Sequence, residues 1–169
     1  MPQGLPQRLQ FAALCDELGA PRIEARAAVA GFFLDDGTAN SFGMRYLHEE
    51  GFDWIEARSI YRRDAYVRYR KVDGRIEQQE IDRLSAGHVF TSTHEQRPGG
   101  VSVQRQEIRE RQGGRLLAQA ATARFDGGTA KWVLGAWGAA SCPNPVTAAG
   151  NAAFRASYHL ARDTLGRRP

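Results

Sequence analysis

The chain has 169 residues, of which 42% are hydrophobic and 25% are charged. These values favour one globular domain over residues 1–169 with a core of its own, and they exclude a disordered chain. The net charge of +4 is compatible with an anionic ligand but is too small to require nucleic acid. No apolar run approaches the roughly 18 residues of a membrane span, so we expect no membrane partner.

The N-terminal residues and the two cysteines indicate the cellular compartment and whether a metal site is expected. The first ten residues contain no apolar stretch of the kind found in secretory signals, which favours a cytoplasmic location. Cys15 and Cys142 lie far apart in the sequence, and in such a compartment free thiols are favoured over a bridge. Neither cysteine belongs to a CxxC or Cys/His cluster, so we expect no metal site.

Residues 1–36 are predicted to form a helical segment of two short helices. The first has an apolar stripe with helical spacing and a glycine that ends it: Phe11, Leu14, Cys15, Leu18 and Gly19. The run 22–34 is predicted to form the second helix, because apolar residues recur at helical spacing after Pro21. Asp35–Gly37 would then end that helix.

From residue 42 the period of the pattern changes to that of strands. Residues 42–140 contain eight strand-like runs divided by short turns rich in glycine, which predicts an antiparallel meander in which neighbours in sequence are neighbours in the sheet. Asp73-Gly74 between two alternating runs is the strongest of these hairpin signals, because both central positions of such a turn need a positive φ. Residues 144–166 then predict a closing helix, with Asn144 as its cap and Pro145 in its first turn.

These elements predict a mainly β fold with flanking helices. Eight meandering strands can close into an eight-stranded antiparallel barrel, and a strongly curved sheet wrapped on the terminal helix is the competing architecture. The layout of N-terminal helix, eight-stranded meander and C-terminal helix is similar to that of lipocalin-type barrels, although the early Gly-x-Trp of such barrels is missing. This resemblance implies a cavity for one small, partly hydrophobic molecule.

The run 75–84 has polar residues on both faces, which a half-buried strand should not have. One explanation is an edge strand with both faces in solvent, where charges discourage pairing between sheets. The other is a partly polar interior that holds a ligand with hydrogen-bonding groups. The sequence leaves both explanations open.

Two sets of side chains are candidates for a ligand site. Arginines among tyrosines could clamp an anion, and large rings could line an apolar cavity, although cross-strand ion pairs and ordinary packing would explain the same patterns. The candidate ligand-binding residues are Trp54, Arg58, Arg68, Tyr69, Phe90 and Trp132. His88, His94 and Glu56 are the candidates for proton transfer. The two histidines are about 20 Å apart if they lie on one strand, so they cannot share one proton.

The sequence therefore predicts a protein that binds a small, partly hydrophobic and anionic molecule, without a cofactor. Folds of this kind host carriers and also isomerase- or lyase-type enzymes of biosynthesis, and the sequence does not separate the two. One alternative is an accessory or inhibitor protein that uses the charged strand face as an interface. A second alternative, single-stranded nucleic-acid binding, is disfavoured because acidic residues lie among the arginines. A homodimer is compatible with all three.

Overall fold

The structure, a computed structural model, describes residues 4–35, 43–127 and 139–166. The fold is mainly β, with 42% strand and 24% helix, as the sequence predicts. The chain divides into two compact units, each built from three segments. Unit 1 contains Met1–Arg22, Thr93–Arg105 and Ala120–Tyr158, and unit 2 contains Ile23–Ser92, Gln106–Gln119 and His159–Pro169.

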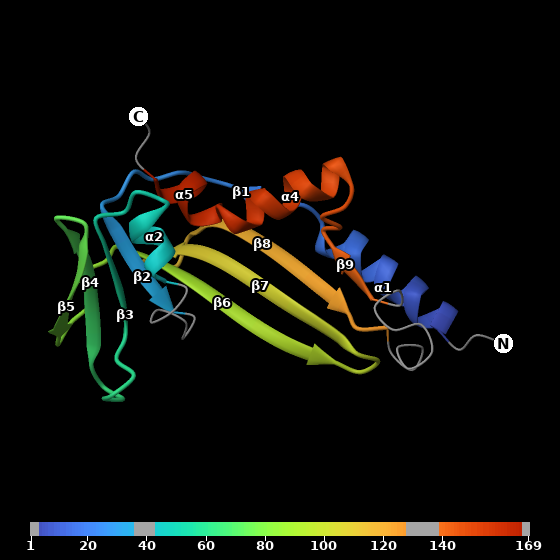
Figure 1. The fold of residues 1–169 in the computed structure, drawn as a ribbon, viewed down its shortest axis with the longest axis horizontal. Coiled ribbons are helices and arrows are strands. Elements are labelled where there is room, and N and C mark those ends of the chain that lie inside the picture. The colour runs from blue at the N-terminus through green and yellow to red at the C-terminus, as the bar shows by residue number, and fades with distance from the viewer. Residues whose placement is uncertain (1–3, 36–42, 128–138, 167–169) are drawn as a thin grey trace. The chain divides into compact units, whose positions relative to one another are not determined.

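The strands of the described residues form one mixed sheet (Figure 1). Their order is β1-β8-β7-β6-β2-β3-β4-β5, with β9 paired to β8. Because β1 and β5 end this order without pairing to each other, the sheet is open, and the closed barrel is not formed. The bounds are β1 (Arg22–Ile23), β2 (Gly31–Asp35), β3 (Trp54–Arg58), β4 (Tyr66–Val72), β5 (Arg75–Ile81), β6 (His88–Arg97), β7 (Val101–Glu110), β8 (Leu116–Phe125) and β9 (Ala140–Cys142).

The predicted second helix over 22–34 is wrong, because this segment contains β1 and β2 instead. Strand β2 runs parallel to both β3 and β6 and is buried along almost its whole length. A central parallel strand is apolar on both faces, and a short run of that kind cannot be told from a buried helix by its periodicity. Gly31 is required at its start, since a Cβ there would lie 2.1 Å from the backbone oxygen of Trp54.

Two meanders, rather than one, make up the sheet. Strands β3, β4 and β5 are antiparallel neighbours, joined at β4–β5 by the predicted turn, where Asp73 and Gly74 have φ values of 49° and 78°. Strands β6, β7 and β8 are neighbours in the second meander. Between them the chain leaves β5, at the edge of the sheet, and crosses to β6 beside β2. Residues 82–87 are therefore a crossover loop and not the hairpin turn that the sequence predicts.

The position of β5 settles which explanation of its polar faces holds. It ends the strand order, and five of its seven residues are exposed. Strand β5 is therefore an edge strand with solvent on both faces, the first of the two explanations. Its charges are of the kind that keep exposed edges from pairing with other sheets.

The helices differ from the prediction in two further places. Helix α2 (Met44–His48) replaces the strand expected after residue 42. The closing helix is divided into α4 (Ala148–Tyr158) and α5 (Leu160–Leu165), which are separated by His159. The predicted strand over residues 129–140, which includes Trp132, lies almost wholly outside the described residues.

In unit 1, helix α1 (Gly4–Leu18) packs its predicted stripe on the sheet residues of that unit. Its core contains Phe11, Leu14, Val103, Ala123 and Phe125, and the rings of Phe11 and Phe125 lie 5.8 Å apart. The expectation of free thiols is wrong, because Cys15 and Cys142 form a disulfide, with their Cα atoms 5.7 Å apart. Tertiary contact between α1 and β9, which the sequence does not reveal, brings the two cysteines together.

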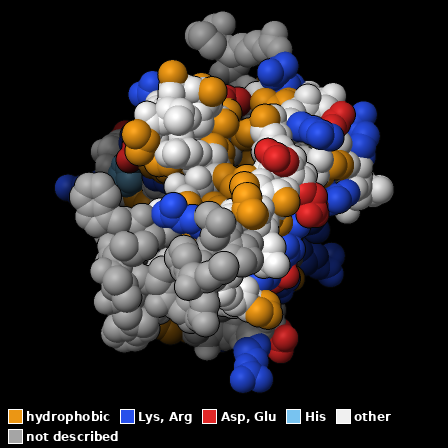
Figure 2. Space-filling model, turned by 90° about the vertical axis from the view of Figure 1, so that its right-hand side faces the viewer, with side chains coloured by type: hydrophobic (Ala, Val, Ile, Leu, Met, Phe, Trp, Pro, Cys, Tyr) orange, Lys and Arg blue, Asp and Glu red, His pale blue; other side chains and the backbone are white. Residues whose placement is uncertain are grey.

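Hydrophobic side chains on the end of unit 1 that carries α1 are scattered among polar and charged ones (Figure 2). Leu9 on α1 is 65% exposed and Val146 before α4 is 91% exposed. Isolated apolar residues of this kind are normal on a protein surface and need no partner.

In unit 2, aromatic rings fill the core. Phe32 on β2 contacts the rings of Tyr46, Phe52 and Phe90 at centroid distances of 5.2, 4.9 and 6.3 Å. All four residues are at most 4% exposed. Helix α5 completes this unit, since the backbone N–H groups of Ala27 and Val29 donate to carbonyl groups at its C-terminal end.

Candidate functional site

The crossover loop between β5 and β6 is held in place by a buried carboxylate on β3. Glu56 is fully buried, and it accepts hydrogen bonds from the backbone N–H groups of Ser85 and Ala86 at 3.0 Å and from the Ser85 hydroxyl at 2.8 Å. The guanidinium of Arg68 on β4 donates to the same carboxylate, with Nε at 3.2 Å. Glu56 thus supplies acceptors for a loop whose N–H groups have no strand partner.

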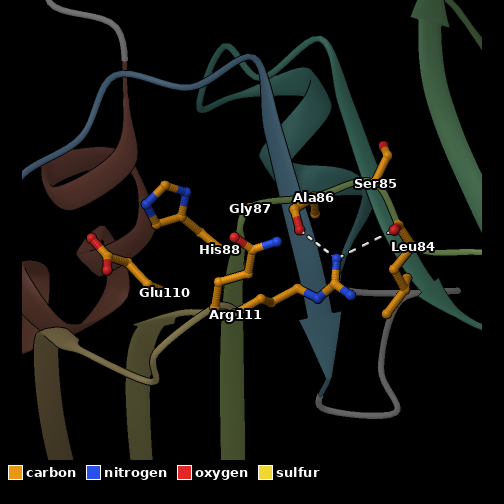
Figure 3. A pocket seen from close by; sticks show the side chains of 8 residues that line it. Leu84, Ser85, Ala86, Gly87, His88, Glu110 and Arg111 are labelled. Carbon is orange, nitrogen blue, oxygen red and sulfur yellow. Dashed lines mark hydrogen bonds between the residues drawn. The ribbon is translucent and has the colours of Figure 1, made fainter.

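An arginine on the opposite side binds the carbonyl groups of the same loop. Nη1 of Arg111 donates to the carbonyl oxygen of Ala86 at 2.6 Å and to that of Leu84 at 3.3 Å (Figure 3). The backbone N–H of Arg111 also donates to the carbonyl oxygen of Gly87 at 2.8 Å. The loop 84–87 is therefore fixed by a carboxylate on its N–H side and by a guanidinium on its C=O side.

This fixed loop forms one wall of a cavity of about 560 Å³ in unit 2. The volume lies within the range of about 300–1,000 Å³ that small-molecule sites occupy. Leu84 is partly exposed and gives the wall some apolar surface, whereas Ala86 is only 2% exposed. The other wall is the end of β7, and the residues that line the cavity are Leu84, Ser85, Ala86, Gly87, His88, Glu110, Arg111 and Gln112.

His88 is the sequence-predicted proton-transfer residue that lines this cavity. Burial lowers the pKa of its imidazole below the ordinary value; the carboxylate of Glu110 acts in the opposite direction, and the guanidinium of Arg115 lowers the pKa further. The ring is therefore neutral near pH 7 and can both donate and accept a hydrogen bond. Glu110 is paired with Arg115 at 2.9 Å and remains one-third exposed.

The other predicted proton-transfer residues lie elsewhere. His94 is exposed in unit 1, where its Nε2 lies 2.7 Å from Nε2 of Gln96, and it does not line the cavity. The pKa of Glu56 is lowered: burial, the largest single effect, raises it, but the hydrogen bonds from Arg68, Ala86 and Ser85 together outweigh burial. An ionised carboxylate whose oxygens are occupied by donors holds the loop in position, and its role in proton transfer stays a prediction.

The predicted ligand-binding residues lie in different places: in the core, on the surface and beside Glu56, which holds the loop 84–87. Tyr69 and Phe90 are buried in the core. Arg58 is exposed and donates to Asp35 at 2.8 Å. Arg68 supports the loop through Glu56, and its guanidinium lies 5.0 Å from the ring centroid of Trp54. Trp132 lies outside the described residues.

Sequence reasoning missed a second cluster of charges in unit 2. Glu50, which the sequence analysis does not single out, is buried and accepts from Arg45 at 3.0 Å and from Nδ1 of His159 at 3.2 Å. Arg45 also donates to the hydroxyl of Tyr46. Glu50 and His159 are 109 residues apart, so no local spacing could have paired them. Glu110 and Arg111 were missed for the same reason, because their role depends on the crossover.

Comparison with known proteins identifies no relative. No protein-family model, no curated protein and no solved structure matches the chain. No helix within the described ranges is both long and apolar enough to cross a membrane. No group of three or more potential metal ligands occurs among the residues that the structure describes.

Proposed function

We propose that this protein binds a small, partly hydrophobic, anionic molecule in the cavity between the loop 84–87 and the end of β7. The proposal is supported above all by the loop itself, which is held from both sides by charged side chains, Glu56 and Arg111. A wall fixed before the ligand arrives lowers the entropy cost of binding. Burying a carboxylate for this purpose is costly unless its hydrogen bonds are complete, as they are at Glu56.

The chemistry of the lining supports an acid as the ligand. Arg111 uses one terminal nitrogen for the loop, and its other guanidinium N–H groups make no hydrogen bond to the described residues. These donors can bind a carboxylate or another oxyanion. The neutral ring of His88 can donate to the same ligand, while Leu84 offers apolar contact.

To test the proposal, the protein is titrated with a simple acid probe, hexanoate, and binding is measured by isothermal titration calorimetry. Gly87 lines the cavity, and a Cβ built there meets no atom within 4 Å, so Gly87→Leu should fill the cavity without disturbing the fold. We expect the wild type and Gly87→Ala to bind hexanoate and Gly87→Leu to lose at least about tenfold in affinity. Equal binding by all three proteins would place the ligand elsewhere and overturn the proposal.

The remaining functional predictions need their own measurements. Proton transfer by His88 in an isomerase- or lyase-type reaction, a protein interface on the charged strands and a homodimer all stay predictions. Binding to single-stranded nucleic acid would weaken steeply with salt, whereas binding in a cavity would change little, so a salt titration separates these two functions.

The cytoplasmic location also stays a prediction, and the disulfide bears on it. Disulfides are rare in reducing compartments, so the Cys15–Cys142 bond favours an oxidising one. Trapping the thiols with an alkylating reagent in intact cells measures which redox state the protein has where it works. Reduced cysteines would support the cytoplasm.

A further inference from the structure

The two charged residues at the end of β7 reach opposite parts of the cavity. Glu110 and Arg111 are adjacent in sequence and both line it. In Figure 3 their side chains extend away from each other, with the ring of His88 on the side of Glu110 and the loop 84–87 on the side of Arg111. The cavity therefore has an anionic end and a cationic end.

The anionic end can accept a ligand. The ion pair between Glu110 and Arg115 has its arginine 63% exposed and its carboxylate 34% exposed, and exposed pairs of this kind contribute little to stability. A ligand cation can share the carboxylate with Arg115 or replace it. The neighbouring imidazole is neutral near pH 7 because burial lowers the pKa of His88, so it does not repel a cation.

We infer that the ligand of this cavity is zwitterionic, with its acid group on Arg111 and an ammonium group on Glu110, as in an amino acid. This inference rests on the proposed function, because it concerns the same cavity. It adds a cationic group to the ligand and assigns Glu110 as the residue that recognises it. A charge-assisted hydrogen bond at each end of one small molecule would fix its orientation.

The test compares three matched series of probes: ω-amino acids of increasing chain length, the acids that lack the amine, and the amines that lack the acid. Binding is followed from the NMR shifts of the Gly87 amide and the His88 ring. We expect an ω-amino acid of suitable length to bind about tenfold more tightly than the matched acid. Glu110→Gln should remove this advantage and leave the affinity for the acid unchanged, while Arg115→Gln should preserve the advantage.

Glu107→Gln is the matched control, because Glu107 also lies on β7 in a half-exposed ion pair, with Arg109, but does not line the cavity. If acid and ω-amino acid bind equally well and Glu110→Gln changes nothing, the zwitterion inference is wrong and the acid site stands. If no probe binds the wild type, or if Gly87→Leu binds as well as the wild type, the proposed function itself is wrong. Binding of the amines alone would overturn both.

Discussion

Among the described residues of unit 2, two carboxylates are buried, and their surroundings affect them in opposite ways. Glu56 is fully buried and Glu50 is 7% exposed, yet the pKa of Glu56 is lowered and that of Glu50 is raised. Burial is the largest single effect on both. The difference lies in the donors, since Glu56 receives bonds from Arg68, from the Ser85 hydroxyl and from two backbone N–H groups.

Glu50 has fewer partners around it. Arg45 and His159 both contact its Oε1, and its buried Oε2 has no hydrogen-bond partner among the described residues. Burial therefore prevails over the charges of Arg45, His159 and Arg162, which lower the pKa. The comparison indicates that the donors around a buried carboxylate help to decide whether its pKa is raised or lowered.

The largest expected effect is that of removing the charge of Glu56. Glu56→Gln should lower the free energy of unfolding by about 3–5 kcal/mol, because it leaves Arg68 without its partner and replaces an acceptor oxygen by an amide that faces other donors. Urea unfolding measures this loss. The control is Glu80→Gln, which breaks an exposed ion pair with Arg62 and should leave the urea midpoint almost unchanged. Similar losses in both variants would contradict the account.

The contributions of the two carboxylates to stability should change in opposite directions with pH. The pKa of Glu56 is lowered from 4.5, so its contribution is present above 4.5 and is lost as the pH falls through its folded-state pKa. The pKa of Glu50 is raised from 4.5, so its contribution is present below 4.5 and is lost as the pH rises through its folded-state pKa.

Urea midpoints between about pH 3 and pH 7 test these directions in the wild type, Glu56→Gln and Glu50→Gln. The advantage of the wild type over Glu56→Gln should shrink as the pH falls. The stability of the wild type relative to that of Glu50→Gln should decrease as the pH rises. Parallel curves for the two variants would show that the carboxylates do not differ.

At pH 7, Glu50→Gln should cost clearly less than Glu56→Gln, about 1 kcal/mol. The amide oxygen of the glutamine can still accept from Arg45, and the neutral side chain no longer has to bury a charge beside an unpartnered oxygen. Chemical unfolding at that pH measures the difference. A loss as large as that of Glu56→Gln would mean that Arg45 and His159 stabilise the charge more than its burial disfavours it.

A similarly small effect is expected from Ser85→Ala. This change removes the 2.8 Å hydrogen bond from the hydroxyl to Glu56 and the one that the hydroxyl accepts from Arg68. Both backbone N–H groups stay in place, so we expect a loss of about 1 kcal/mol. Combined with Glu56→Gln, it should add almost nothing, because the partner is already changed. Full additivity of the two losses would show that the hydroxyl does not act through Glu56 and its partner Arg68.

Local patterns predicted the parts of the fold that depend on neighbours in sequence. The Asp73-Gly74 turn, the stripe of α1 and the mainly β class follow from turn chemistry and periodicity. Strand β2 was missed because a parallel strand buried on both faces lacks alternation. The crossover from β5 to β6 could not be predicted from the sequence, because a loop of this length resembles a hairpin turn until the strand order is known.

The candidate site was accessible to sequence reasoning only in part. His88 and Glu56 were singled out as titratable residues, but the purpose of Glu56 depends on Ser85 and Ala86, which lie 29 and 30 residues later. Arg111 reaches the same loop from the turn that follows β7. Residues far apart in the sequence make this site, so it follows from the topology of the sheet and not from any motif.

We propose that the carboxylate of Glu56 holds the loop 84–87 in place as the wall of a binding cavity. Amide hydrogen exchange of Ser85 and Ala86, followed by NMR in the wild type and in Glu56→Gln, tests it most directly. The account predicts that both amides are strongly protected in the wild type and exchange much faster in the variant, while amides in the centre of β4 keep protection consistent with the variant's overall stability. Fast exchange of Ser85 and Ala86 in the wild type, or unchanged protection in the variant, would contradict the account.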